Sequence, residues 1–204
     1  MGRTQSEIME EREEKVDGLI AEMKGQGYSL NDLSVDGDKA NKAALLIGAV
    51  VSAVIVLLFG LLCGWSKFGD VDYPLVLFAA MLSVLVHEGI HGLFFGIFAK
   101  NHFKSIEFGI IWKSVNPYCY CGEPLSRLHY MTGLLMPAFI LGFCTAAAGL
   151  IAGNASLIIF SVISIFLAGG DLYIAGLILK TSQKGREELY LDHPNKPGVI
   201  VLAK

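Results

Sequence analysis

Residues 74–99 read PLVLFAAMLSVLVHEGIHGLFFGIFA, and this stretch decides the class of fold. A helix needs about 20 mostly apolar residues to cross the roughly 30 Å of hydrocarbon in a bilayer. The stretch is long enough for this, and apart from two histidines its only ionisable side chain is that of Glu88. We therefore predict a membrane-spanning helix that carries a polar group, His87-Glu88-Gly89-Ile90-His91, inside an apolar sequence.

Three other stretches have the same character, and with the first they predict four transmembrane helices. They cover residues 43–63, 130–152 and 155–179, and Asp171 is the only charged residue in them. The whole chain is 53% hydrophobic and 17% charged, whereas soluble domains are about 25% charged. A soluble protein with several buried helices is the alternative, but such helices rarely run this long without a charge. The expected fold is an all-α integral membrane protein.

The distribution of lysine and arginine predicts the orientation. Apart from Lys67, these residues lie before the first predicted span, between the second and third, or after the fourth. Because lysine and arginine favour cytoplasmic loops, we expect a multi-pass protein of a bacterial plasma membrane with both termini in the cytosol. The chain then divides into a cytosolic N-terminal segment (1–42), a membrane domain (43–180) and a cytosolic tail (181–204).

Two further elements are expected outside the spans. The sequence Thr4-Gln5-Ser6-Glu7 resembles a capping box and predicts an amphipathic cytosolic helix that ends near Gly25 and Gly27. Alternating side chains in residues 103–121 predict a small β-hairpin between the second and third spans. Its Cys119 and Cys121 are interpreted as two strand residues on one face, with a metal-binding pair as the alternative. Within the third span, Met136-Pro137 is expected to kink the helix or break it locally.

The polar group in the second span has the form His-Glu-x-x-His, which suits metal-dependent hydrolysis. Positions i and i+4 of a helix lie on one face, so His87 and His91 can offer ring nitrogens to one ion. Zinc lowers the pKa of a bound water to near 7, and the adjacent Glu88 is placed to act as its general base. Ionisable residues are costly inside a membrane and are usually functional there.

Asp171 in the fourth span is the predicted third metal ligand. It lies nine residues before Lys180, just as His91 lies nine residues before Lys100. At 1.5 Å per residue, both side chains are about 13 to 14 Å from the cytosolic end of their spans. The preceding Gly169 and Gly170 allow a close helix approach or a bend. Two histidines and a carboxylate leave one position for water, as in catalytic zinc sites.

Other interpretations of these residues remain open. Asp171 could pair with His87 or His91 without a metal and hold helices together. The protein could also be a non-catalytic metal-binding membrane protein, either a transporter or a scaffold. Asn116 is a candidate substrate-binding residue, since an amide near a metal can hold a carbonyl oxygen, but a plain turn residue is the favoured interpretation.

The sequence resembles the DUF3267-type zincin peptidases and, more distantly, the site-2 class of intramembrane metalloproteases. The resemblance covers about residues 75–180 and is carried by Val86-His87-Glu88-Gly89-Ile90-His91-Gly92, Phe108, Asn116-Pro117, Glu123-Pro124-Leu125-Ser126, Met136-Pro137 and Gly169-Gly170-Asp171. It implies a Zn2+ ion bound by His87, His91 and an aspartate, with Glu88 as general base. Site-2 proteases usually carry Asn-Pro-Asp-Gly or Leu-Asp-Gly around that aspartate, where this chain has Gly169-Gly170-Asp171-Leu172.

The sequence thus predicts an intramembrane zinc metalloprotease that hydrolyses peptide bonds of membrane-associated substrates. Its expected partners are a membrane protein or peptide substrate and the lipid bilayer, and nucleic acid is not among them.

Overall fold

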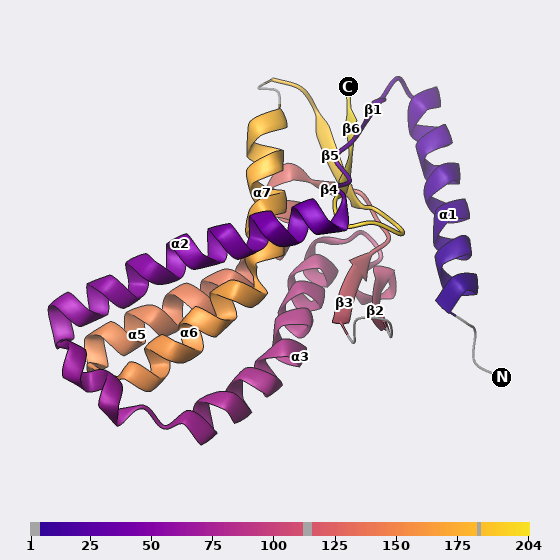
Figure 1. Cartoon of the computed structure of the whole chain (residues 1–204). Coiled ribbons are helices and arrows are strands. Elements are labelled where there is room, and N and C mark those ends of the chain that lie inside the picture. Colours follow the sequence, from indigo (N-terminus) through magenta and orange to yellow (C-terminus); the bar gives the residue numbers. More distant parts are fainter. Residues whose placement is uncertain (1–4, 112–115, 183–184) are drawn as a thin grey trace.

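The structure is a computed structural model that describes residues 5–111, 116–182 and 185–204. A bundle of long helices continues into a smaller part, which holds a four-stranded sheet and the N-terminal helix (Figure 1). The hairpin lies between helix α3 and helix α1, where the two parts meet (Figure 1).

In the part of the chain that the structure describes, three helices are long and apolar enough to cross a membrane, and a bent pair forms a fourth candidate. The first two are α2 (Gly37–Cys63) and α3 (Tyr73–Phe98). The third runs over Arg127–Ala152 and comprises α4 (Arg127–Pro137), η3 (Ala138–Cys144) and α5 (Thr145–Ala152). The bent pair is α6 (Ala155–Leu167) and α7 (Gly169–Thr181), which meet at 54°. At 1.5 Å per residue, the 26 residues of α3 extend about 39 Å.

Capping residues fix where several of these helices begin. The side chain of Asp36 accepts from two backbone N–H groups of the first turn of α2. The side chain of Asn154 does the same for α6, and that of Asp72 accepts from one backbone N–H group, that of Leu75, at the start of α3. Such caps satisfy donors that a helix start leaves without partners. Gly153, in the left-handed conformation at φ 59°, ends α5 and allows the tight turn into α6.

The predicted distortion at Met136-Pro137 takes the form of a wider helical turn. Residues Ala138–Cys144, directly after Pro137, are π-helical, and the helix then continues as α5. Proline lacks an N–H and its ring clashes with the preceding turn. The span nevertheless continues through these residues into α5, so the distortion does not break it.

A glycine begins α7, directly after the bend from α6. A Cβ on Gly169 would lie 2.7 Å from the carbonyl oxygen of Ala44, which belongs to α2. A side chain there would collide with backbone, so glycine permits the contact between α7 and α2. Gly170 has open space around it, and the predicted close approach therefore belongs to Gly169.

The predicted hairpin is present, with strand bounds narrower than 103–121. Strand β2 (Ile106–Ile111) pairs antiparallel with β3 (Asn116–Cys121), and Phe108 lies opposite Cys119. A short 3-10 helix, η2 (His102–Ser105), precedes β2. Residues 112–115 lie outside the described part.

A second sheet corrects the expectation that the hairpin is the only β-structure. Its strand order is β1-β6-β5-β4, and every pairing is antiparallel. Its strands come from the N-terminal segment, the link between the second and third long helices, and the C-terminal tail: β1 (Ser29–Asp32), β4 (Leu125–Ser126), β5 (Glu188–Asp192) and β6 (Val199–Ala203). Segments far apart in the sequence therefore share one structure.

The predicted N-terminal helix, α1 (Gln5–Gly25), packs on this sheet. Its Val16 is buried and contacts a cluster that contains Leu191 of β5 and Ile200 of β6. Gly27 follows at φ 91°, a conformation that favours glycine.

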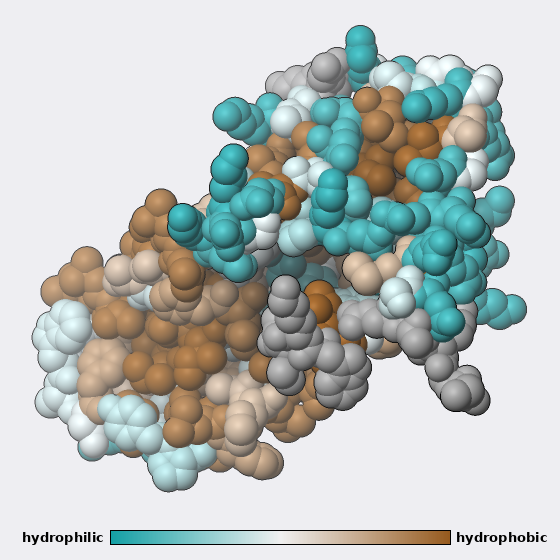
Figure 2. All heavy atoms as spheres, turned by 45° about the vertical axis from the view of Figure 1, so that its right-hand side comes forward, coloured by the Kyte–Doolittle hydropathy of each residue, from teal (hydrophilic) through white to brown (hydrophobic). Residues whose placement is uncertain are grey.

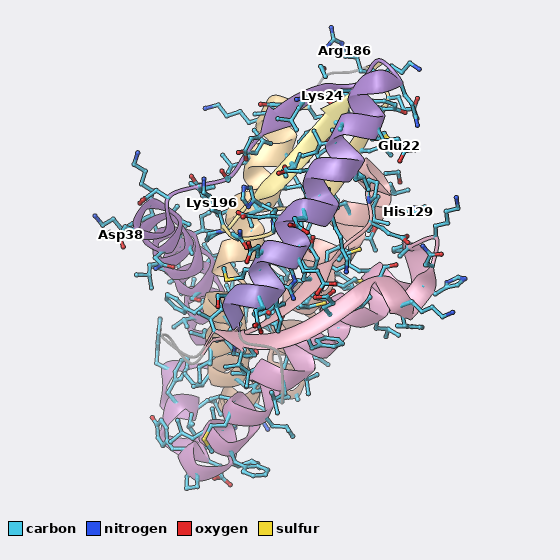
Figure 3. The ribbon with its side chains drawn as sticks, turned by 90° about the vertical axis from the view of Figure 1, so that its right-hand side faces the viewer. Glu22, Lys24, Asp38, His129, Arg186 and Lys196 are labelled. Carbon is cyan, nitrogen blue, oxygen red and sulfur yellow. The ribbon has the colours of Figure 1, made fainter. Side chains whose placement is uncertain are left out.

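The surface divides into an apolar half and a polar half (Figure 2). Charged residues Glu22, Lys24 and Arg186 lie at the far end of the polar half (Figure 3). The apolar half exposes many large side chains, among them Leu45, Leu46, Leu61, Leu62, Phe78, Met81, Leu85 and Ile151. Soluble monomers rarely expose so large an apolar patch, and this surface is consistent with contact to lipid.

Candidate metal centre

The structure brings together His87, His91 and Asp171, the three predicted ligands. One ligand atom from each lies within 4.8 Å of the others. His87 Nε2 is 3.1 Å from His91 Nε2 and 3.1 Å from Asp171 Oδ2. His91 Nε2 is 3.5 Å from Asp171 Oδ2. Helix α3 places the two histidines one turn apart, and α7 supplies the aspartate.

These distances fit a zinc ion. Tetrahedral ligands about 2.0–2.1 Å from zinc lie about 3.3–3.4 Å from one another. The three observed separations, 3.1, 3.1 and 3.5 Å, bracket that value. His87 Nε2 has two close contacts, and a single proton on this atom could satisfy only one of them. A cation between the three ligand atoms would satisfy all three of their contacts.

A backbone contact fixes the tautomer of His91. Its Nδ1 lies 2.9 Å from the carbonyl oxygen of Gly133 in α4. A carbonyl only accepts, so Nδ1 donates, and Nε2 of the neutral ring keeps its lone pair for a ligand. Metal-binding histidines are typically held in this way. Gly133 allows the approach because a Cβ there would lie 2.3 Å from the ring of Phe95.

Glu88 lies next to the candidate ligands. It follows His87 on α3, lines the same cavity, and accepts a hydrogen bond from the backbone N–H of Cys119. It also interacts electrostatically with His91 and Asp171. The carboxylate therefore lines the cavity that also holds the three converging atoms.

The edge of β3 that does not pair with β2 faces two carboxylates, those of Glu88 and Asp192. Alternate residues of an antiparallel pair direct their N–H groups away from the partner strand. In β3 these include Cys119, whose N–H donates to Glu88, and Cys121, whose N–H donates to Asp192 Oδ2 at 2.8 Å.

A cavity of about 410 Å³ surrounds the metal candidates. Its walls come from α1, α3, the hairpin, α4, the α6–α7 bend and the turn between β5 and β6. Among the lining residues are Met9, Glu88, Tyr118, Tyr130, Asp171, Asp192 and Asn195. Every long helix except α2 contributes to this wall.

Sequence reasoning missed Asp192, a second carboxylate in this wall. It lies at the end of β5, where its Oδ1 accepts from the Tyr130 hydroxyl at 2.6 Å. Burial raises its pKa above the usual range, and the hydrogen bonds from Tyr130 and Cys121 oppose that shift. Nothing in the tail sequence marks it, because its partners are 62 and 71 residues away.

Sequence reasoning also missed Arg12, whose side chain binds α1 to the hairpin. It is buried, and its Nε donates to Glu107 Oε2 at 2.8 Å while an Nη donates to the Tyr118 hydroxyl at 3.2 Å. Its guanidinium lies 4.4 Å from the centre of the Tyr120 ring. Seen from its own side, α1 lies across the hairpin (Figure 3).

Two other candidates do not join the metal group. Cys119 and Cys121 alternate along β3, as two strand residues on one face should, and neither belongs to the ligand group found among the described residues. Burial raises the pKa of the Cys121 thiol to about 12 and raises that of Cys119 as well. Asn116 begins β3 opposite Ile111, and its side chain lies outside the described part.

Comparison with known proteins places the chain in a family. A family model, DUF3267, described as "Putative zincin peptidase", matches residues 80–184. The matched segment contains His87, Glu88, His91 and Asp171. No curated protein and no solved structure matches the chain.

Proposed function

Because this chain belongs to the DUF3267 family of zincin peptidases, we propose that it is an intramembrane zinc metalloprotease. His87, His91 and Asp171 hold the metal, and Glu88 is the general base. The observation that carries this proposal is the convergence of two imidazole Nε2 atoms and one carboxylate oxygen beside Glu88, in a cavity bounded by candidate membrane helices.

Zinc bound there supplies a Lewis acid that lowers the pKa of water to near 7 and polarises a peptide carbonyl. Glu88 accepts the proton of the attacking water and delivers it to the leaving amine nitrogen. Gly133 holds His91 through Nδ1, and Gly169 permits α7, which carries Asp171, to approach α2.

The substrate is a membrane-associated protein or peptide that is extended where it is cut. A helical peptide bond is shielded by its own hydrogen bonds and by its neighbours, so it must unwind first. The unpaired edge of β3 supports binding by strand addition, because that edge runs beside Glu88 and its Cys119 amide already faces the site. An incoming strand would compete with Glu88 for this amide.

The sheet supports four crossings with both termini on one side. Strand β1 precedes α2, and its partner β6 follows α7. Two paired strands lie on the same side of a membrane, so the chain between them crosses an even number of times. Counting the bent pair α6 and α7 as one span gives four. With the positive-inside rule, this side is the cytosol of a bacterium.

The other candidate function is a non-catalytic metal-binding membrane protein. Transport would need a polar path through both halves of the bilayer, whereas the described part of α2 has charged residues only in its first two turns, at Asp38, Lys39 and Lys42. This function remains the alternative outcome of the experiment below.

The test compares purified wild-type protein with Glu88→Gln in detergent micelles. Zinc content is measured by mass spectrometry, and cleavage is measured on a mixture of fluorescence-quenched peptides with randomised sequences. We expect both proteins to bind zinc and the variant to lose about 100-fold or more in cleavage rate. Native-rate cleavage by the variant would contradict the role of Glu88. Bound zinc without cleavage by either protein would favour the non-catalytic function.

A further inference from the structure

The cavity extends beyond the metal candidates to the turn between β5 and β6. The last residue of β5, Asp192, and the turn residues His193, Pro194, Asn195 and Lys196 belong to the wall. Asp192 also interacts electrostatically with His91 and Asp171, so the turn lies close to the candidate metal centre.

Asp192 has unused capacity to accept hydrogen bonds. An ionised carboxylate offers about four acceptor positions, and the two bonds from Tyr130 and Cys121 use one on each oxygen. Within the described ranges, no lysine or arginine nitrogen lies within the 4.0 Å of an ion pair with it. A buried carboxylate without a cation is costly, and the raised pKa of Asp192 agrees with this.

Asn195 supplies an independent sign of a missing donor. Its side-chain oxygen is buried and has no hydrogen-bond partner in the described structure. Two backbone N–H groups of the turn do not supply this donor, because those of Asn195 and Lys196 both donate to His193 Nδ1, at 3.2 and 3.1 Å. Buried polar groups without partners are rare, and this one is in a residue that lines the cavity.

We propose that Asp192 and Asn195 form a subsite for an ammonium group of the peptide substrate. The inference rests on the proposed function and deepens it by naming a substrate class. An ammonium has three donors and no acceptor, which complements a carboxylate with free lone pairs and an amide oxygen without a partner. Its source is either a lysine side chain near the scissile bond or the N-terminal amine of the peptide.

The experiment measures binding, so that it does not depend on cleavage. Short alanine- and leucine-rich peptides with a C-terminal fluorophore are titrated with zinc-loaded, full-length Glu88→Gln protein in detergent, and anisotropy is recorded. One peptide has a central lysine and an acetylated N-terminus. The second has norleucine and a free N-terminus, and the third has norleucine and an acetylated N-terminus.

We expect at least one ammonium-bearing peptide to bind about tenfold more tightly than the third peptide. Adding Asp192→Asn should reduce this preference to less than about twofold, while Asp17→Asn, which removes one exposed carboxylate of α1, should leave it unchanged. Tighter binding of the first peptide identifies a lysine side chain as the source of the ammonium, and tighter binding of the second identifies the N-terminal amine. Equal affinity for all three peptides, or no measurable binding of either ammonium peptide, overturns the proposal.

Two variants of Asn195 keep the test valid if Asp192→Asn does not fold. Asn195→Ala leaves the bonds of Asp192 to Tyr130 and Cys121 in place and should weaken the ammonium preference, whereas Asn195→Asp should strengthen it. An unchanged preference in both variants contradicts the proposal. Selective binding without cleavage by wild type would overturn only the proposed protease function. Cleavage of all three peptides at one rate, with no selective binding, would overturn only the subsite.

Discussion

Asp171 Oδ2 lies 3.1 Å from His87 Nε2, although 84 residues separate the two in the sequence. This contact joins α7 to α3 and completes a set of three converging ligand atoms. It depends on the bend that follows α6, since a straight continuation of that helix would carry Asp171 along a different line.

Removing Asp171 should therefore remove the metal. We expect Asp171→Ala to bind zinc at least about 100-fold more weakly than wild type, because a lost ligand costs more than a lost outer hydrogen bond. Competition with a chromogenic chelator measures the affinity, and Asp38→Ala, which changes an exposed residue at the start of α2, is the control. If Asp171→Ala loses stability while neither protein binds zinc, the contact is a metal-free link between helices.

Gly133→Ala should weaken zinc binding through His91. The added Cβ would lie 2.3 Å from the Phe95 ring, so either that ring or α4 must shift. We expect α4 to shift and the bond from His91 Nδ1 to the Gly133 carbonyl to lengthen. Loss of such an outer bond typically costs about 10- to 100-fold in metal affinity. The chelator assay measures it.

The control for this variant is Gly176→Ala, since a Cβ at Gly176 meets nothing within 4 Å. A second substitution, Phe95→Leu, should restore part of the affinity by making room beside residue 133. Unchanged affinity in Gly133→Ala would show that this carbonyl does not position His91.

Gly169→Ala should destabilise the protein and displace Asp171. Its Cβ would lie 2.7 Å from the carbonyl oxygen of Ala44, and a backbone atom cannot rotate away. We expect a melting temperature several degrees lower and weaker zinc binding, measured by scanning fluorimetry with and without zinc. Gly170→Ala is the matched control because the space around Gly170 is open. Equal melting temperatures for the two variants would contradict the close approach of α7 to α2.

The sequence predicted the long helices and the candidate metal ligands, because a bilayer restricts both the length and the polarity of a spanning helix. Apolar length alone located the long helices, and the cost of ionisable groups in lipid singled out His87, Glu88, His91 and Asp171. Equal depth then paired His91 with Asp171, because two spans of similar geometry place equally distant residues at one level. These arguments need only local composition and the rise of a helix.

Such local arguments could not predict the four-stranded sheet. Its strands have five residues or fewer and come from three distant segments, so no local pattern reveals that they pair. Asp192 was missed for the same reason, since it reaches the cavity only because β5 lies in that sheet. Arg12 looked like one more charge on a solvated helix, and its burial depends on Glu107, 95 residues away.

Arg12→Ala should release α1 from the hairpin. The substitution removes hydrogen bonds to Glu107 and Tyr118 and contact with the Tyr120 ring. Bonds to charged groups contribute about 1.5–3 kcal/mol each, so amide hydrogen exchange in α1 should become markedly faster. Mass spectrometry of deuterium uptake measures this.

The control for the release of α1 is Lys15→Ala, which breaks an exposed ion pair with Glu11 within the same helix and should change the exchange little. Met9 and Arg12 both line the cavity, so Arg12→Ala should also speed the binding of bulky peptides. Native exchange rates in Arg12→Ala would show that the packing of Val16 alone holds α1.

Asp192 should make stability depend on pH in a direction opposite to that of a salt-bridged carboxylate. Burial raises its pKa in the folded protein above the ordinary value of 3.8, so the folded state binds this proton more tightly than the unfolded state. The free energy of unfolding then falls as pH rises from about 3.8 toward the folded pKa. Asp192→Asn cannot titrate and lacks this contribution.

The measurable result is a difference between two melting curves. Across pH 4 to 8 the melting temperature of wild type minus that of Asp192→Asn should decrease as pH rises, because only wild type must ionise a buried group. Asp17→Asn, which changes an exposed carboxylate, should show no such trend. A difference that grows with pH would mean that the ionised carboxylate is the stabilised form, as it would be if a cation of the protein already occupied the subsite beside Asn195.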